Sequence, residues 1–191
     1  MDAPKPLRIV DHDPRWAERF AETGTTLRAA LGDRALRIDH IGSTSVVGLG
    51  AKDVVDIQVT VARLVDVDAW PTELLPGLTR RPIASDHLPP GMAGLPEEWS
   101  KRMWSRSQHL HVHVREDGRS NQRYALVFRD YLRNDSVAAG AYEAVKRALA
   151  LHVPNDWDTY YAVKDQACDL IWAGAEQWAR RVGWQPGASD V

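Results

Sequence analysis

The first third of the chain changes from a helical to a strand-like hydrophobic period. Large apolar residues recur on one helical face from Trp16 to Leu31, which predicts a helix over residues 14–31 with Asp13 as its cap. Strict alternation of apolar and polar side chains then predicts strands over residues 35–41 and 54–61. We therefore expect a helix followed by two strands, each with two distinct faces.

The middle of the chain is less regular. Residues 67–78 favour a helix, whereas residues 80–99 contain four prolines and predict a long irregular loop. A third strand is predicted over residues 108–114. It places His109, His111 and His113 on one face, because side chains at every second position of a strand point the same way.

The last third is helical throughout. Capping residues and apolar stripes predict helices over residues 120–133, 136–152 and 156–182. Strands early and helices late favour an α+β, or mixed α/β, fold in which helices pack against a small mixed sheet. A length of 191 residues fits a single domain over residues 1–191.

Composition narrows the class of protein. Hydrophobic residues make up 44% and charged residues 26%, which is typical of a globular chain. The formal net charge of -2 disfavours nucleic acid as a partner. The single Cys168, the lack of an apolar N-terminal segment and the lack of about 18 consecutive apolar residues favour the cytoplasm and no membrane contact.

The first candidate for chemistry joins a turn to a strand carboxylate. In the nucleotidyltransferase fold a strand ends in Gly-Ser, whose backbone and hydroxyl hold phosphate, and the next strand offers two carboxylates at i and i+2 that bind Mg²⁺. Here Gly42 and Ser43 fit the turn and Asp56 fits the first carboxylate. Gln58 stands at the second position and brings no charge. The alternative is an ordinary tight turn beside a satisfied polar strand face.

A longer match makes the resemblance specific. Residues 40–57, HIGSTSVVGLGAKDVVDI, resemble the signature of the GrpB family, as do residues 109–112, residues 128–133 and Tyr142-Glu143-x-x-Lys146. The resemblance extends from about Val10 to Trp178 and departs at Val47 and Asp53, where proline is common. It implies a nucleotidyltransferase-like fold of unestablished activity, similar to a domain fused behind dephospho-coenzyme A kinase in some bacteria. The chain itself has no Gly-x-x-x-x-Gly-Lys-Ser/Thr loop.

The histidine strand is the second candidate. His109, His111 and His113, with Asp56 from a neighbouring strand and His40 as a further member, have the residue types of a divalent metal site. Imidazole favours Zn²⁺ or Mn²⁺, whereas Mg²⁺ prefers oxygen. The alternatives are hydrogen-bonded histidines in a half-buried sheet face, or protonated histidines that bind a substrate anion.

Basic and aromatic side chains add weaker candidates. Seven cations are available for a phosphate or carboxylate, and most are expected to be ordinary surface charges. They are Lys52, Lys101, Arg102, Arg129, Arg133, Lys146 and Lys164. Lys52, Arg102 and Arg129 are the ones we assign to substrate, and Trp99 and Trp104 are placed to line a pocket.

These features together predict a protein that binds a nucleotide or another phosphorylated metabolite. Gly42, Ser43, Thr44, Ser45 and Gln58 would line the phosphate site. In the catalytic version, Asp56 holds a divalent metal such as Mg²⁺, Mn²⁺ or Zn²⁺ for nucleotidyl transfer. The alternative is a non-catalytic ligand-binding or accessory module that has lost the transferase carboxylates and stabilises a protein partner.

Overall fold

A computed structural model describes residues 6–91, 95–106 and 109–191 and contains one mixed sheet. Its strands are β1 (Arg37–Ile41), β2 (Val55–Val61), β3 (Glu73–Leu75), β4 (Leu78–Arg81), β5 (Arg102–Arg106) and β6 (Leu110–Glu116). Their order across the sheet is β1-β2-β6-β5-β4-β3. Strands β2 and β6 run parallel, and the other neighbouring pairs are antiparallel. The mixed sheet predicted from the sequence is confirmed.

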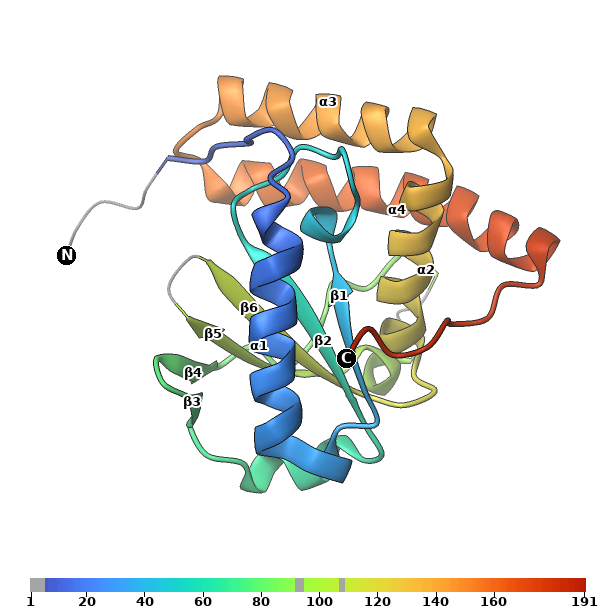
Figure 1. Ribbon diagram of the computed structural model, residues 1–191. Helices are drawn as coiled ribbons and strands as arrows, with labels where there is room; N and C mark the ends of the chain where they lie inside the picture. Colours follow the sequence, from blue (N-terminus) through green and yellow to red (C-terminus); the bar gives the residue numbers. More distant parts are fainter. Residues whose placement is uncertain (1–5, 92–94, 107–108) are drawn as a thin grey trace.

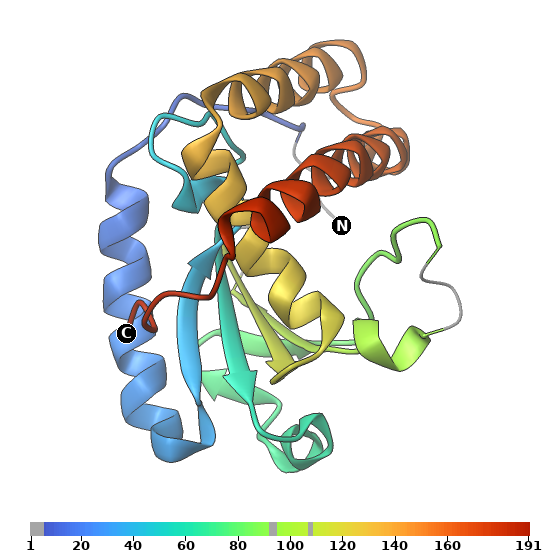
Figure 2. The same ribbon diagram turned by 90° about the vertical axis from the view of Figure 1, so that its right-hand side faces the viewer.

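Helices cover both faces of this sheet and one of its ends. Helix α1 (Arg15–Leu31) lies on one face and α2 (Ser120–Asn134) on the other, as Figure 2 shows. Helices α3 (Ser136–His152) and α4 (Trp157–Val182) lie across the end of the sheet at the top of Figure 1. Within the described parts of the chain, none of the helices has the length and apolar character needed to cross a membrane.

The two faces of the sheet differ in chemistry. Against α1 the packing is apolar, with Trp16 and Leu27 of the helix buried on Ile57 and neighbouring strand residues. Against α2 it is polar: Gln58 and Thr60 are fully buried there. Buried polar groups are stable only when hydrogen-bonded. The polar face is therefore where a network of specific contacts must form.

Most predicted elements are confirmed to within two residues at each end. The predicted helix over residues 67–78 is wrong: a 3-10 helix (Leu64–Ala69) is followed by β3 and β4. The reason lies in Pro76 and Gly77, which form the turn between these strands, with Gly77 at a φ of +73°. Gln108, the first residue of the predicted third strand, lies outside the described residues.

The predicted loop over residues 80–99 is also shorter than expected. Strand β4 runs to Arg81, and a 3-10 helix (Pro96–Trp99) closes the segment before β5. Strand β5 was not predicted, because Met103 and Trp104 are consecutive and both buried, so buried and exposed side chains do not alternate along this segment.

Candidate functional site

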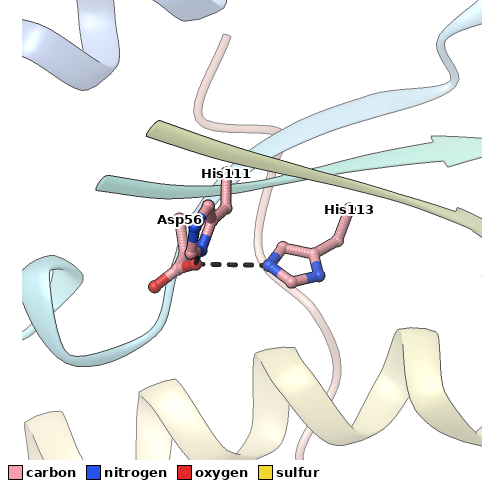
Figure 3. Close-up of side chains that lie close together, drawn as sticks. All are labelled: Asp56, His111 and His113. Atoms are coloured by element: carbon pink, nitrogen blue, oxygen red, sulfur yellow. Dashed lines mark hydrogen bonds and ion pairs between the residues drawn. The ribbon is translucent and has the colours of Figure 1, made fainter. Parts of the chain in front are cut away.

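Asp56, His111 and His113 form a compact cluster on the polar face of the sheet. The parallel pairing of β2 with β6 sets Asp56 opposite His111 and Gln58 opposite His113. Asp56 Oδ1 lies 3.1 Å from His111 Nδ1 and 3.2 Å from His113 Nε2 (Figure 3). The side chains of Asp56 and His111 are 28% and 27% exposed, so the cluster reaches solvent.

The cluster combines a fixed negative charge with neutral imidazole. Burial alone would raise the pKa of Asp56, but hydrogen bonds from His111 and His113 outweigh it and hold the pKa well below its usual range. Burial, reinforced by Lys101, lowers the pKa of His113 to about 4. At neutral pH the site therefore offers a carboxylate beside an uncharged His113.

A network of buried charged side chains contacts His113 at Nδ1, the ring nitrogen that does not face Asp56. Lys101 Nζ lies 3.3 Å from His113 Nδ1 and donates to Asp86 Oδ1 at 2.6 Å. Asp86 also accepts two bonds from Arg115, at 2.8 and 2.9 Å, and one from Asn121. Sequence reasoning missed Asp86, because it lies in the proline-rich segment where no period marks a buried residue.

Gln58 takes part in this network and has no free polar group for a ligand. Its Oε1 accepts from Arg115 Nη1 at 2.6 Å, and its Nε2 donates to the backbone carbonyl of Gln122 at 3.1 Å. The side chain is fully buried. The position of a second metal-binding carboxylate is thus occupied by an amide that is already hydrogen-bonded at both ends.

The Gly42–Ser45 turn packs directly against the cluster. Gly42 has a φ of +70°, and a Cβ atom there would lie 2.8 Å from Asp56 Oδ2. The Ser45 hydroxyl donates to the carbonyl of Gly42 at 2.6 Å, and Thr44 Oγ1 lies 3.0 Å from His40 Nε2. Ser43 instead faces α3, where Lys146 Nζ donates to its Oγ at 2.9 Å. Only glycine allows the turn to approach Asp56 this closely.

Gly42→Ala should displace Asp56 as well as strain the backbone. Gly42 combines a φ of +70° with a ψ of -173°, a region nearly exclusive to glycine that costs another residue about 1–3 kcal/mol, and the new Cβ would also collide with the carboxylate. Gly48→Ala is the matched control, since Gly48 has a φ of +83° but open space around its Cβ. Urea unfolding should show a larger loss for Gly42→Ala. Equal losses in the free energy of unfolding would mean that the contact with Asp56 adds nothing to the cost of the Gly42→Ala substitution.

Several predicted site residues are not brought to the cluster. His109 is largely exposed and lies beside Asp53. Arg102 is ion-paired with Asp68. His40 points to the opposite face of the sheet, where its ring stacks on Phe20 with centroids 4.8 Å apart, so it is not a further member of the metal site.

Two further cations have their own partners. Buried Arg129 donates from Nη1 to the His40 carbonyl at 3.1 Å and to Asp190 at 2.9 Å. Lys52 Nζ lies over the ring of Tyr161, 5.1 Å from its centroid, and close to two more aromatic rings. Trp99 and Trp104 are buried in packing contacts. The structure thus keeps Lys52 half-exposed near the turn and places Arg129 in a structural contact.

The donor set of the cluster fits a transition metal ion better than Mg²⁺. One ligand atom each from Asp56, His111 and His113 lies within 4.8 Å of the others, and a tetrahedral Zn²⁺ site needs about 3.3–3.5 Å between ligands. Closing this gap takes small side-chain rotations. If His113 Nε2 bound a metal ion, the ring proton would lie on Nδ1. The Lys101 ammonium would then have to turn away from Nδ1 and keep its hydrogen bond to Asp86.

One family model and several curated proteins match most of this chain in sequence. The family model described as GrpB protein matches residues 6–173. A dephospho-CoA kinase from Mycolicibacterium paratuberculosis is 36% identical over 95% of this chain, which spans about half (49%) of that protein's length. A UPF0157 protein from Streptomyces coelicolor is 35% identical, covering 87% of this chain and 81% of its own.

A solved structure agrees with these matches. The crystal structure of a conserved protein GrpB from Enterococcus faecalis superposes with a TM-score of 0.72 at 29% identity, covering 90% of this chain and 99% of the other. The matched regions include β1, β2, β6 and the turn beside Asp56. From the family match and the shared fold, the chain belongs to the GrpB family.

Proposed function

We propose that this protein binds a divalent transition metal ion through Asp56, His111 and His113, together with the phosphate group of a small molecule. The observation that carries the proposal is the convergence of one carboxylate and two imidazoles at a solvent-reaching point of an otherwise buried polar face. Two neutral imidazoles and one carboxylate are typical ligands of Zn²⁺, Mn²⁺ or Fe²⁺.

Positive charge beside the cluster supports the phosphate part of the proposal. Arg133 donates twice to the carbonyl of Ser45, so its guanidinium lies against the turn that packs on Asp56. A second cation, half-exposed Lys52, lies close enough to Lys146 to lower the pKa of Lys146, and Lys146 in turn contacts Ser43 of the same turn. A phosphate oxygen bound to the metal would thus meet cations on the turn side.

The same geometry favours binding over nucleotidyl transfer. A two-metal transfer site needs paired carboxylates, and Gln58 is fully engaged by Arg115 and Gln122. In the described parts of the chain, one group of three histidine, cysteine or carboxylate side chains could hold a metal ion, and it consists of Asp56, His111 and His113. Asp86, the carboxylate reached through Lys101, is neutralised by two cations. A ligand-binding site that carries out no nucleotidyl transfer therefore accounts best for these contacts.

Thermal unfolding with Zn²⁺, Mn²⁺ or Mg²⁺ tests the metal site. Zn²⁺ and Mn²⁺ should raise the melting temperature of the wild type, because a ligand that binds the native state stabilises it. Removing one of three ligands in Asp56→Ala or His111→Ala should weaken metal binding by more than the about 10–100-fold typical of outer-shell changes. His109→Ala is the control, since His109 lies outside the cluster.

The metal-loaded protein is then titrated with ATP and with dephospho-coenzyme A, the latter chosen because of the names of the relatives. A further shift that depends on metal and on Asp56 supports the proposal, and chromatography should reveal no transfer product. An unchanged melting temperature with every metal, or equal shifts in wild type and Asp56→Ala, would contradict it and favour an accessory module for a protein partner.

A further inference from the structure

Ser43 and Lys146 form a hydrogen-bonded pair that the proposed metal site does not use. Ser43 lies in the 3-10 turn after β1, and Lys146 extends from α3 to within 2.9 Å of Ser43 Oγ. The lysine is buried, with 2% of its surface exposed, whereas Ser43 is only partly buried. Ser43 is therefore the more accessible residue of the pair.

The surroundings of Lys146 orient its amine. The Nζ group donates to the carbonyl of Gly50 at 2.6 Å. That carbonyl is held in place because the Gly50 N–H donates to Glu143 Oε2 at 2.6 Å. In the neutral amine one N–H satisfies Gly50, and the lone pair is left to accept the proton of the Ser43 hydroxyl. A side chain at Gly50 would collide with Glu143 and Arg147, at 2.6 and 2.7 Å.

Burial leaves Lys146 neutral more often than an ordinary lysine. Burial lowers the pKa of Lys146 to about 7, from 10.5. Glu143 and Cys168 oppose this change and Lys164 and Lys52 add to it. On the same helix, the ring centroid of Tyr142 lies 4.5 Å from Lys146 Nζ, and the guanidinium of Arg147 lies beside Gly50.

We propose that Ser43 is a nucleophile toward activated carboxylic esters, with Lys146 as its general base. Ser43 Oγ attacks the carbonyl carbon while its proton moves to Lys146 Nζ. The bond from that carbon to the leaving oxygen then breaks, and the proton on Lys146 passes to the leaving alcohol. Water, giving a proton to Lys146, then attacks the carbonyl carbon of the resulting serine ester. The bond from that carbon to Ser43 Oγ breaks, the acid is released, and Lys146 returns its proton to Ser43 Oγ.

This chemistry follows from the residue types and their placement. A serine hydroxyl is a weak nucleophile until an adjacent base takes its proton, and a buried lysine is one of the bases that serve this role. The pair needs no metal, so it works independently of Asp56, His111 and His113. Ser136 is the natural comparison, because it is an exposed serine at the first position of α3.

The experiment uses p-nitrophenyl acetate with EDTA-treated full-length protein. Release of p-nitrophenol should rise with pH and level off above about 7. Intact mass and peptide mapping of samples stopped with acid in the first turnover should show one acetyl group on Ser43. Lys146→Arg stays protonated and Lys146→Met has no amine, so each should react at least about 100-fold more slowly, which is the lower range for general-base catalysis. Ser43→Ala should lose the label and Ser136→Ala should keep it.

Several results would overturn the proposal. Acetylation of Lys146 or of a surface lysine in place of Ser43, a Ser43→Ala variant that reacts at the wild-type rate, or a wild-type rate independent of pH would each do so. The two serine variants are conservative, so the outcome does not depend on whether the lysine variants fold. Since metal is removed throughout, failure here leaves the metal-binding proposal standing, and its failure leaves this one standing.

Discussion

Replacing Asp86 with alanine should lower the free energy of unfolding by about 3–5 kcal/mol, the usual cost of removing one partner from a buried ion pair. Asp86 is 17% exposed and accepts hydrogen bonds from Lys101, Arg115 and Asn121. Without it, two buried cations lose their shared counter-charge. Equilibrium unfolding in urea, followed by tryptophan fluorescence, measures the change.

Asp68→Ala is a matched control for this prediction. Asp68 also bridges two cations, Arg80 and Arg102, but its side chain is 45% exposed and water screens its charge. The expected loss is below about 1 kcal/mol, as for exposed ion pairs. Similar losses in the free energy of unfolding for the two aspartate variants would mean that the buried ion pairs of Asp86 stabilise the fold no more than the exposed ion pairs of Asp68.

Acid should destabilise the protein through His40. The ring is 5% exposed, stacks on Phe20, and burial lowers its pKa to about 4 from the ordinary 6.5. Between pH 6.5 and 4 the unfolded chain takes up a proton at this position that the folded chain does not accept. The free energy of unfolding therefore falls as the pH drops through this range, by about 3 kcal/mol from His40 alone.

Urea unfolding at a series of pH values compares the wild type with His40→Gln. The variant should lose about this much less stability on acidification, and a residual loss should come from His113, whose pKa is also about 4. Thr44→Val removes the hydrogen-bond partner of His40 without removing the titrating ring, so its pH profile should keep the wild-type slope. Superimposable profiles for His40→Gln and wild type would contradict the assignment.

Local sequence signals account for the elements that were predicted well. Helix α3 begins where expected because the Asp135 side chain accepts from backbone N–H groups in the first turn of that helix. Strand β2 alternates cleanly because one of its faces packs on α1 and the other meets polar partners. For the same reason, His111 and His113 were correctly placed on one face of β6.

The remaining contacts depend on register and on loops. Periodicity shows that Asp56 and His111 lie on strands, but only the pairing of β2 with β6 sets them opposite each other. His40 alternates with Asp39 and was therefore as good a candidate as any until β1 placed it on the face toward α1. The contact between Lys146 and Ser43 joins residues 103 positions apart, which no local pattern can reveal.

The parallel pairing of β2 and β6 also bears on how the protein folds. Asp56 and His111 are 55 residues apart in sequence, and β3, β4 and β5 lie between them along the chain. The three residues of the proposed metal site therefore come together only after this long segment has closed, a non-local step that is slow compared with forming a helix. On the ribosome, a growing chain that has not yet exposed β6 has no such site, and a metal ion can stabilise only late intermediates.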